Sequence, residues 1–223
     1  MKPRDFFNAK VSDEIQEEIV RTFYRAYPDT RDDLVERDYP LDYRQDVYGQ
    51  LLRVKVDMYL RQLSKRFPEQ IKARTDPNNA NNSHHALIIS DKVVMTASAV
   101  QHETDVPREA IFRACLAALT QVEFEFDEAT NSFIIPNPKP DPEYPQLYAV
   151  ILHGSAGDNR YLPGFIKVAF LDRKMNRLCA DIDLSVKYRD LVDEMLVTDT
   201  EKIPDKTTVV PNKEISSKQG TLL

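Results

Sequence analysis

The sequence predicts an α+β protein with a helical N-terminal region, a central helix with hairpins, and a C-terminal antiparallel sheet with a terminal helix. Two observations support this class. Apolar residues recur at helical spacing in the first third of the chain, whereas later segments alternate apolar and polar residues as half-buried strands do. The expected strands also follow one another without intervening helices, which favours antiparallel pairing over a wound parallel sheet.

The composition is that of a globular chain with no strong overall preference for a partner. Its 223 residues suffice for one large domain or two small ones. The net charge of −6 comes from mixed acidic and basic residues, so the whole molecule does not attract a polyanion. With 5 glycines against 14 prolines, Gly-rich phosphate loops are hard to build.

The expected location of the protein depends on its apolar stretches, its targeting segments and its cysteines. No stretch approaches the roughly 18 apolar residues of a membrane helix, and no targeting segment is evident. Cys115 and Cys179 both stand among apolar neighbours, which predicts buried thiols rather than a disulfide. We therefore expect a cytoplasmic protein without membrane contact.

Two helices are expected at the N-terminal end. The first begins after Ser12, a good N-cap residue, and is predicted to stop at Pro28. A charged stretch over residues 29–39 then predicts an exposed connection. A long helix over residues 42–67 follows, with Val54 and Met58 in the apolar stripe that we expect to face the core.

The central region is predicted to mix hairpins with one helix. Residues 75–85 consist of turn-forming and small polar residues and predict a loop. Residues 86–89 and 92–96 predict a strand hairpin. A helix starting near Pro107 should place Cys115 and Leu119 on its apolar face. Alternation over residues 122–126 and 133–135 predicts a second hairpin.

A proline-rich segment is the best candidate boundary, because five prolines within ten residues favour an extended spacer. After it, residues 147–152, 165–170 and 178–184 predict strands, and residues 186–196 predict a helix. The resulting division is a helical and α+β region (1–135), a spacer (136–146), a small β-rich region (147–197) and a flexible tail (198–223).

The sharpest candidate for chemistry combines a Gly-Ser pair with two carboxylates. His153, Gly154 and Ser155 end an expected strand, and Asp181 and Asp183 alternate on a later one. This pattern resembles the nucleotidyltransferase superfamily, in which such carboxylates hold metal ions that clamp a nucleoside triphosphate. The resemblance implies a metal-dependent nucleotidyl- or phosphoryl-transfer enzyme.

The spacing departs from that superfamily, because a whole expected strand separates the Gly-Ser pair from the two carboxylates. The sequence therefore favours a half-solvated sheet in which Asp181 and Asp183 face outward. His153 and Ser155 are the only close nucleophile–base pair, and they lack the Gly-x-Ser-x-Gly elbow. No histidine or cysteine spacing specifies a metal site, so we predict no metal and no cofactor.

Basic residues gather between the end of the long helix and the Asn-rich loop. They are Arg61, Lys65, Arg66, Lys72 and Arg74. Positive charge at a helix C-terminus stabilises the helix, which is the ordinary interpretation. The alternative is a nucleic-acid site that also uses residues 78–85.

Taken together, these patterns favour a non-catalytic binding or regulatory protein that acts through a protein partner. The transfer enzyme and the nucleic-acid-binding module remain as alternatives. The preference depends on the lack of any dense cluster of catalytic residue types at a workable spacing.

Overall fold

The computed structural model describes residues 1–78, 83–120, 123–135, 146–157 and 159–200. The helices are α1 (Pro3–Lys10), α2 (Asp13–Glu36), α3 (Leu41–Arg66), α4 (Ile111–Thr120), α5 (Leu184–Lys187) and α6 (Arg189–Thr200). The strands are β1 (Ile71–Asn78), β2 (Ser83–Ser90), β3 (Val93–Ala99), β4 (Glu125–Asp127), β5 (Ser132–Ile134), β6 (Leu147–Ala156), β7 (Asn159–Leu171) and β8 (Leu178–Asp183). The α+β class predicted from the sequence is confirmed.

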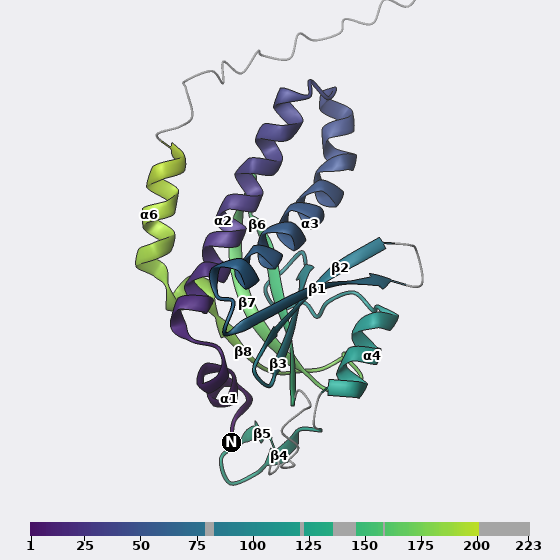
Figure 1. Cartoon of the computed structure of the whole chain (residues 1–223), viewed down its shortest axis with the longest axis vertical. Helices are drawn as coiled ribbons and strands as arrows, with labels where there is room; N and C mark the ends of the chain where they lie inside the picture. The colour runs from purple at the N-terminus through teal and green to yellow at the C-terminus, as the bar shows by residue number, and fades with distance from the viewer. Residues whose placement is uncertain (79–82, 121–122, 136–145, 158, 201–223) are drawn as a thin grey trace, which may run out of the picture.

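One six-stranded sheet forms the centre of the molecule, in the order β1-β2-β3-β6-β7-β8 (Figure 1). All neighbours pair antiparallel except β3 and β6, which pair parallel from Val93 opposite Leu147 to Ala99 opposite His153. A parallel pair requires a crossover connection, and the chain between β3 and β6 carries α4 and the small β4-β5 hairpin. The three strands after the proline-rich segment thus join the same sheet as β1, β2 and β3.

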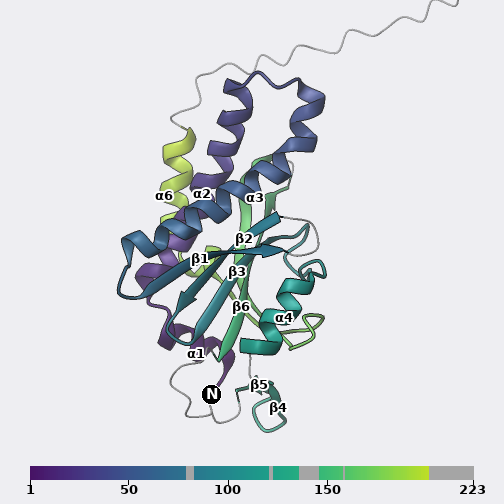
Figure 2. The same ribbon diagram turned by 45° about the vertical axis from the view of Figure 1, so that its right-hand side comes forward.

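Helices cover the two faces of the sheet unequally. The hairpin of α2 and α3, together with α1, packs on one face over a core that includes Phe7, Ile151 and Phe170. Helix α4 lies on the other face (Figure 2). Its Ala117 belongs to the same buried cluster as Leu152 and neighbouring strand residues. Alternate residues of the central strands therefore face two separate cores, which explains why β6 is buried from Leu147 to Gly154.

The first long helix continues through Pro28, so the predicted stop there is wrong. A proline in a helix removes one hydrogen bond and costs about 3 kcal/mol. Contacts with α3 outweigh that cost, since Asp29 accepts a hydrogen bond from Tyr59 and Lys55 pairs with Asp33 at 2.7 Å. Residues 29–36, expected as an exposed connection, are the last turns of α2.

Three smaller differences concern segments with weak patterns. Helix α1 was not predicted from the sequence. Residues 75–78 and 83–85, expected in a loop, belong to strands β1 and β2. The expected terminal helix is divided into α5 and α6. The spacer from 136 to 145 and the tail from 201 lie outside the described residues, and none of the described helices is long and apolar enough to cross a membrane.

Helix α4 turns a different face to the core from the one expected. Cys115 is exposed, and Leu119 is 77% exposed. The helix is apolar on nearly all sides, so its sequence pattern does not select one buried face. The tertiary structure selects the side that carries Leu116 and Ala117.

Candidate functional site

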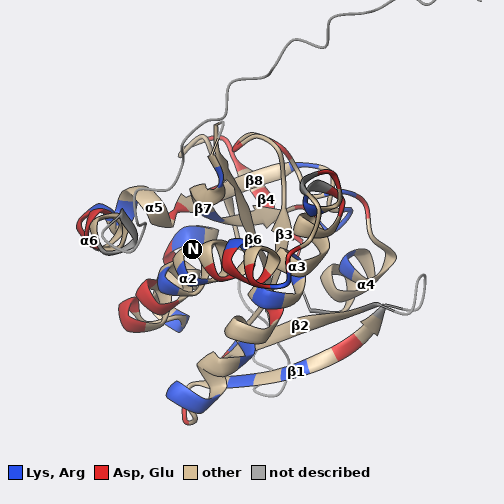
Figure 3. Cartoon of the chain, turned by 90° about the horizontal axis from the view of Figure 1, so that it is seen from above, with Lys and Arg blue, Asp and Glu red and all other residues tan. Residues whose placement is uncertain are grey.

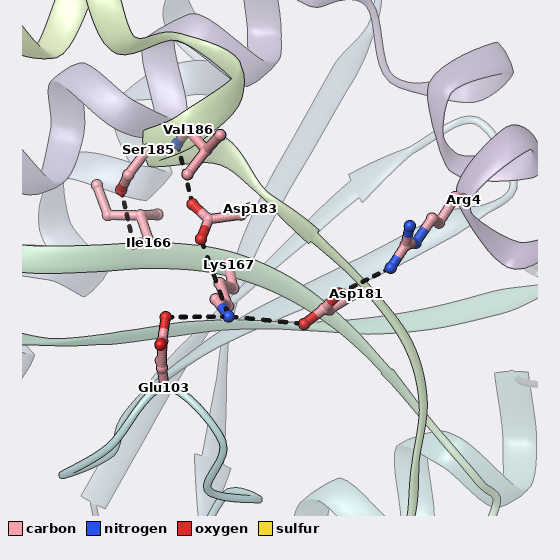
Figure 4. Close-up of polar contacts among 8 residues, drawn as sticks. All are labelled: Arg4, Glu103, Ile166, Lys167, Asp181, Asp183, Ser185 and Val186. Carbon is pink, nitrogen blue, oxygen red and sulfur yellow. Dashed lines mark hydrogen bonds and ion pairs between the residues drawn. The ribbon is translucent and has the colours of Figure 1, made fainter.

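The two carboxylates Asp181 and Asp183 lie beside a lysine (Figure 4). Lys167 on β7 places its Nζ 3.8 Å from an oxygen of each aspartate and 3.2 Å from Glu103 Oε2. Its side chain is only 14% exposed. Because an ammonium group occupies the space between the carboxylates, these oxygens already have a cationic partner.

The remaining oxygens of the same aspartates have structural partners. Asp181 Oδ1 accepts a hydrogen bond from Arg4 of α1 at 2.9 Å. Asp183 Oδ1 accepts one from the backbone N–H of Val186 at 3.0 Å and so caps the start of α5. This cluster ties the N-terminal helix, two strands and the segment with Glu103 together. Within the described residues, no group of three or more His, Cys, Asp or Glu side chains is arranged to hold a metal ion.

Ser155 lies apart from the two aspartates. It pairs with Pro163 on β7, whereas Asp183 pairs with Lys167, whose other neighbour is Leu152. Strands about 4.8 Å apart and residues about 3.3 Å apart along a strand place the α carbons of Ser155 and Asp183 roughly 14 Å from each other. Ser155 instead lines a broad hollow of about 710 Å³ with Glu103 and Phe165.

His153 is buried on the face of the sheet that α2 covers. It is 2% exposed, and its Nδ1 forms a hydrogen bond of 2.9 Å with the hydroxyl of Tyr27. Burial lowers the pKa of His153 to about 3, so the imidazole stays neutral near pH 7. With the Phe23 ring also packed against it at a centroid distance of 4.7 Å, His153 has no path to a substrate in the described surroundings.

The structure divides the five basic residues among different surfaces. Arg66 pairs at 2.6 Å with Glu18, a carboxylate 8% exposed that also contacts two arginines of α2. Arg74 pairs with Asp76 on the same strand. Lys72 and Arg74 alternate with Ala73, which packs toward the helices, so both point to the other face of the sheet. Figure 3 shows Lys or Arg positions along β1 separated by other residue types. Lys65 is exposed on α3.

Of these five residues, Arg61 lines a groove at the place where α3 crosses the β1-β2 hairpin. We call this the hairpin groove, and its volume is about 320 Å³. The residues that α3 contributes are Arg53, Val54, Asp57, Met58 and Arg61. The residues that the hairpin contributes are Thr75, His84, His85 and Ala86.

The hairpin groove exists because β2 leaves the sheet. Strand β2 pairs with β3 only over Ile88–Ser90, and its preceding residues diverge from β3. Helix α3 satisfies part of the diverging backbone. Asp57 accepts a hydrogen bond from the N–H of Ala86, and Arg53 donates one of 2.8 Å to the carbonyl of His84.

Asp57 is the carboxyl group that lines the groove, and its pKa is shifted far from the ordinary value. Burial raises its pKa to about 6, while the bond from Ala86 and the charge of Arg53, 3.7 Å away, act in the opposite direction. The same burial lowers the pKa of His85, whose ring stacks on Phe112 of α4 at 3.8 Å. A carboxyl that titrates near neutrality inside a groove is a common property of functional sites.

The open side of the groove combines apolar and positive groups. Val54 and Met58 are 41% and 51% exposed, although the sequence predicted both to face the core. The core-facing side of α3 is instead the one with Leu52, Val56 and Leu60. Among the described residues Arg61 forms no ion pair, so its guanidinium remains available to a ligand.

The sequence patterns pointed to Arg61 and to residues 78–85, which include His84 and His85, but not to Arg53 or Asp57. A signal for the missed residues was present. Arg53, Asp57 and Arg61 follow one another at intervals of four, which places three charges in one line beside Val54 and Met58. No family model matches this chain, and no curated protein or solved structure matches it significantly.

Proposed function

We propose that this chain is a non-catalytic binding protein, and that its hairpin groove holds an acidic, amphipathic peptide segment of a protein partner. The observation that carries the proposal is the exposed apolar pair Val54 and Met58 lying between Arg53 and Arg61. Apolar side chains of a peptide would cover the pair, and carboxylates would reach the two guanidinium groups, which bind them bidentately.

A peptide suits the groove better than a nucleic acid for two reasons. Asp57 contributes negative charge inside the groove, and the chain as a whole carries −6. A polyanion would extend beyond the two arginines into an unfavourable field, whereas a short acidic peptide would not. The described groove also offers two imidazoles but no Phe, Tyr or Trp ring on which bases could stack.

The test is a fluorescence-polarisation titration of a labelled short peptide of alternating Glu and Leu. Arg61→Glu should weaken binding about tenfold or more, because it replaces attraction by repulsion at the centre of the site. Lys65→Glu is the matched control, since it makes the same charge change one turn away and outside the groove. Its effect should stay within about twofold.

Two results would contradict the proposal. One is equal weakening by Arg61→Glu and Lys65→Glu, which would indicate a general charge effect instead of a groove. The other is binding of a single-stranded oligonucleotide with steep salt dependence while the peptide fails to bind, which would favour the nucleic-acid-binding module.

A further inference from the structure

Helix α4 lies at the outside of the molecule (Figure 2). Its outer side carries apolar residues that are highly exposed in the part of the chain that the structure describes. Leu119 and Ile111 are 77% and 71% exposed, the highest values among the large apolar side chains that the structure describes. Cys115, also exposed, lies midway between them. Because the three residues are spaced by four, they form one line along the helix.

The chain's own contacts use the opposite side of α4. Phe112 stacks on His85, Leu116 packs into the second core, and Ala117 is fully buried. The one charged residue of the helix, Arg113, turns inward and donates to Ser98 Oγ at 3.0 Å. The outer face therefore has no charge to keep it in water, and exposed apolar faces of this kind mark association surfaces.

We propose that this face binds a second copy of the chain, with the two α4 helices packed antiparallel about a two-fold axis. Ile111 and Leu119 lie at equal distances from Cys115, so the line is self-complementary. A two-fold axis at Cys115 sets Ile111 of each copy against Leu119 of the other. The exposed Ala114 and Ala118 beside the line allow the helix axes to approach closely.

Charges at the two ends of α4 complement each other in the same arrangement. Glu109 is exposed just before the helix begins. Arg173 is exposed at the other end, where it donates a hydrogen bond of 2.7 Å to the carbonyl of Ala118. Antiparallel packing brings Glu109 of each copy toward Arg173 of the other, so the pairing occurs twice and disfavours a parallel arrangement.

The size of the helix sets the strength of the expected dimer. Ten residues make a helix about 15 Å long, which is shorter than the side of a standard protein interface. The dimer should consequently be weak and concentration-dependent. This interface does not include the open side of the hairpin groove, so peptide binding and dimerisation can be tested separately.

The first experiment is sedimentation of the full chain over a concentration series, combined with oxidation by copper phenanthroline. The wild-type chain should show a reversible monomer–dimer equilibrium. Oxidation should give a disulfide-linked dimer, because the two Cys115 thiols meet near the axis. Cys179→Ser should still cross-link, whereas Cys115→Ser should not.

The second experiment changes the apolar line itself. Ile111→Lys should raise the dimer dissociation constant about tenfold or more, since it sets a charged side chain against Leu119 of the other copy at both ends of the contact. Val35→Lys is the control, because Val35 is a comparably exposed apolar residue, 55%, on α2. A monomeric chain at all concentrations, or cross-linking through Cys179 instead of Cys115, would overturn the proposal. A third contradicting outcome combines a monomeric wild type with an Ile111→Lys variant of lower folding stability. That combination would indicate that a segment of the same chain covers α4.

Discussion

At the scale of single residues, two buried titratable groups act on stability with opposite signs. His153 has a folded pKa of about 3, below the ordinary value of 6.5. Asp57 has a folded pKa of about 6, above the ordinary value of 3.8. Neither group is explained by its sequence neighbours. Burial is the largest cause in both cases, and burial is set by contacts between distant segments.

The His153 site predicts acid sensitivity. Between pH 6.5 and about 3 the unfolded chain binds a proton at His153 that the folded chain does not, so stability is complete above pH 6.5 and is lost as the pH falls. The slope is about 1.4 kcal/mol per pH unit. Urea unfolding between pH 7 and pH 5 should show that His153→Gln removes this contribution, because glutamine does not titrate. Burial also lowers the pKa of His85, so His85 makes stability fall with pH in the same direction, and this contribution is present in both the wild type and the variant.

Asp57 predicts the reverse dependence. The folded chain keeps a proton at Asp57 between pH 3.8 and about 6, so stability from this group is present at low pH and is lost as the pH rises through 6. Asp57→Asn should therefore raise the free energy of unfolding at pH 8 by about 1 to 3 kcal/mol, since the amide can still accept the bond from Ala86. Asp46→Asn, an exposed change on the same helix, serves as the control. Loss of stability at pH 8 in the Asp57 variant would show that the ionised carboxylate is well compensated.

At the scale of elements, two glycines have opposite structural roles. Gly49 lies inside α3, and a Cβ added there would meet no atom within 4 Å. Gly154 lies in β6, where an added Cβ would stand 2.6 Å from the Phe165 ring and 2.7 Å from the carbonyl oxygen of Val100. The close approach of β6 to its surroundings thus requires glycine, whereas the helix does not.

Alanine substitution at the two glycines should separate these roles. Gly49→Ala should stabilise the chain by about 0.5 to 1 kcal/mol, because alanine is the better helix former and the space is open. Gly154→Ala should destabilise it by about 1 to 3 kcal/mol through overpacking. Thermal unfolding of both variants measures the difference. Equal effects on the midpoint would contradict the contact geometry at Gly154.

The elements with strong periodic patterns were predicted well. The long helix ends within one residue of its prediction, and the strands 147–152, 165–170 and 178–184 all fall within observed strands or at their ends. The failures concern competition between local preference and packing. Pro28 favours a helix end, but contacts with α3 continue the helix.

At the scale of the whole molecule, the parallel pair β3-β6 joins two halves of the chain into one sheet. A chain limited to residues 1–135 would lack β6, β7 and β8, which leaves Val94 and Met95 of β3 paired with β2 but without their partners on β6. We expect this fragment not to fold on its own. Near-UV circular dichroism and dispersion of NMR amide signals measure the outcome. A cooperatively folded fragment would show that region 1–135 is an independent domain.

The candidate site illustrates the same division between sequence and tertiary structure. Arg61 stood out in the sequence as one of five basic residues, and residues 78–85, which include His84 and His85, as the polar segment near them. Their meeting with Asp57 depends on where β2 diverges from β3. That divergence is a property of the assembled sheet and has no local signature.

The sequence by itself determined the class of the fold, the positions of most helices and strands, and the absence of a familiar catalytic spacing. Those properties depend on periodicity and turn chemistry, which act over a few residues. Only the tertiary structure decided which face of α3 and α4 is buried, that Lys167 lies between Asp181 and Asp183, and that Ser155 stands apart from them. These outcomes follow from strand register and from the competition among several apolar faces for one core, and both are settled between segments far apart in the chain.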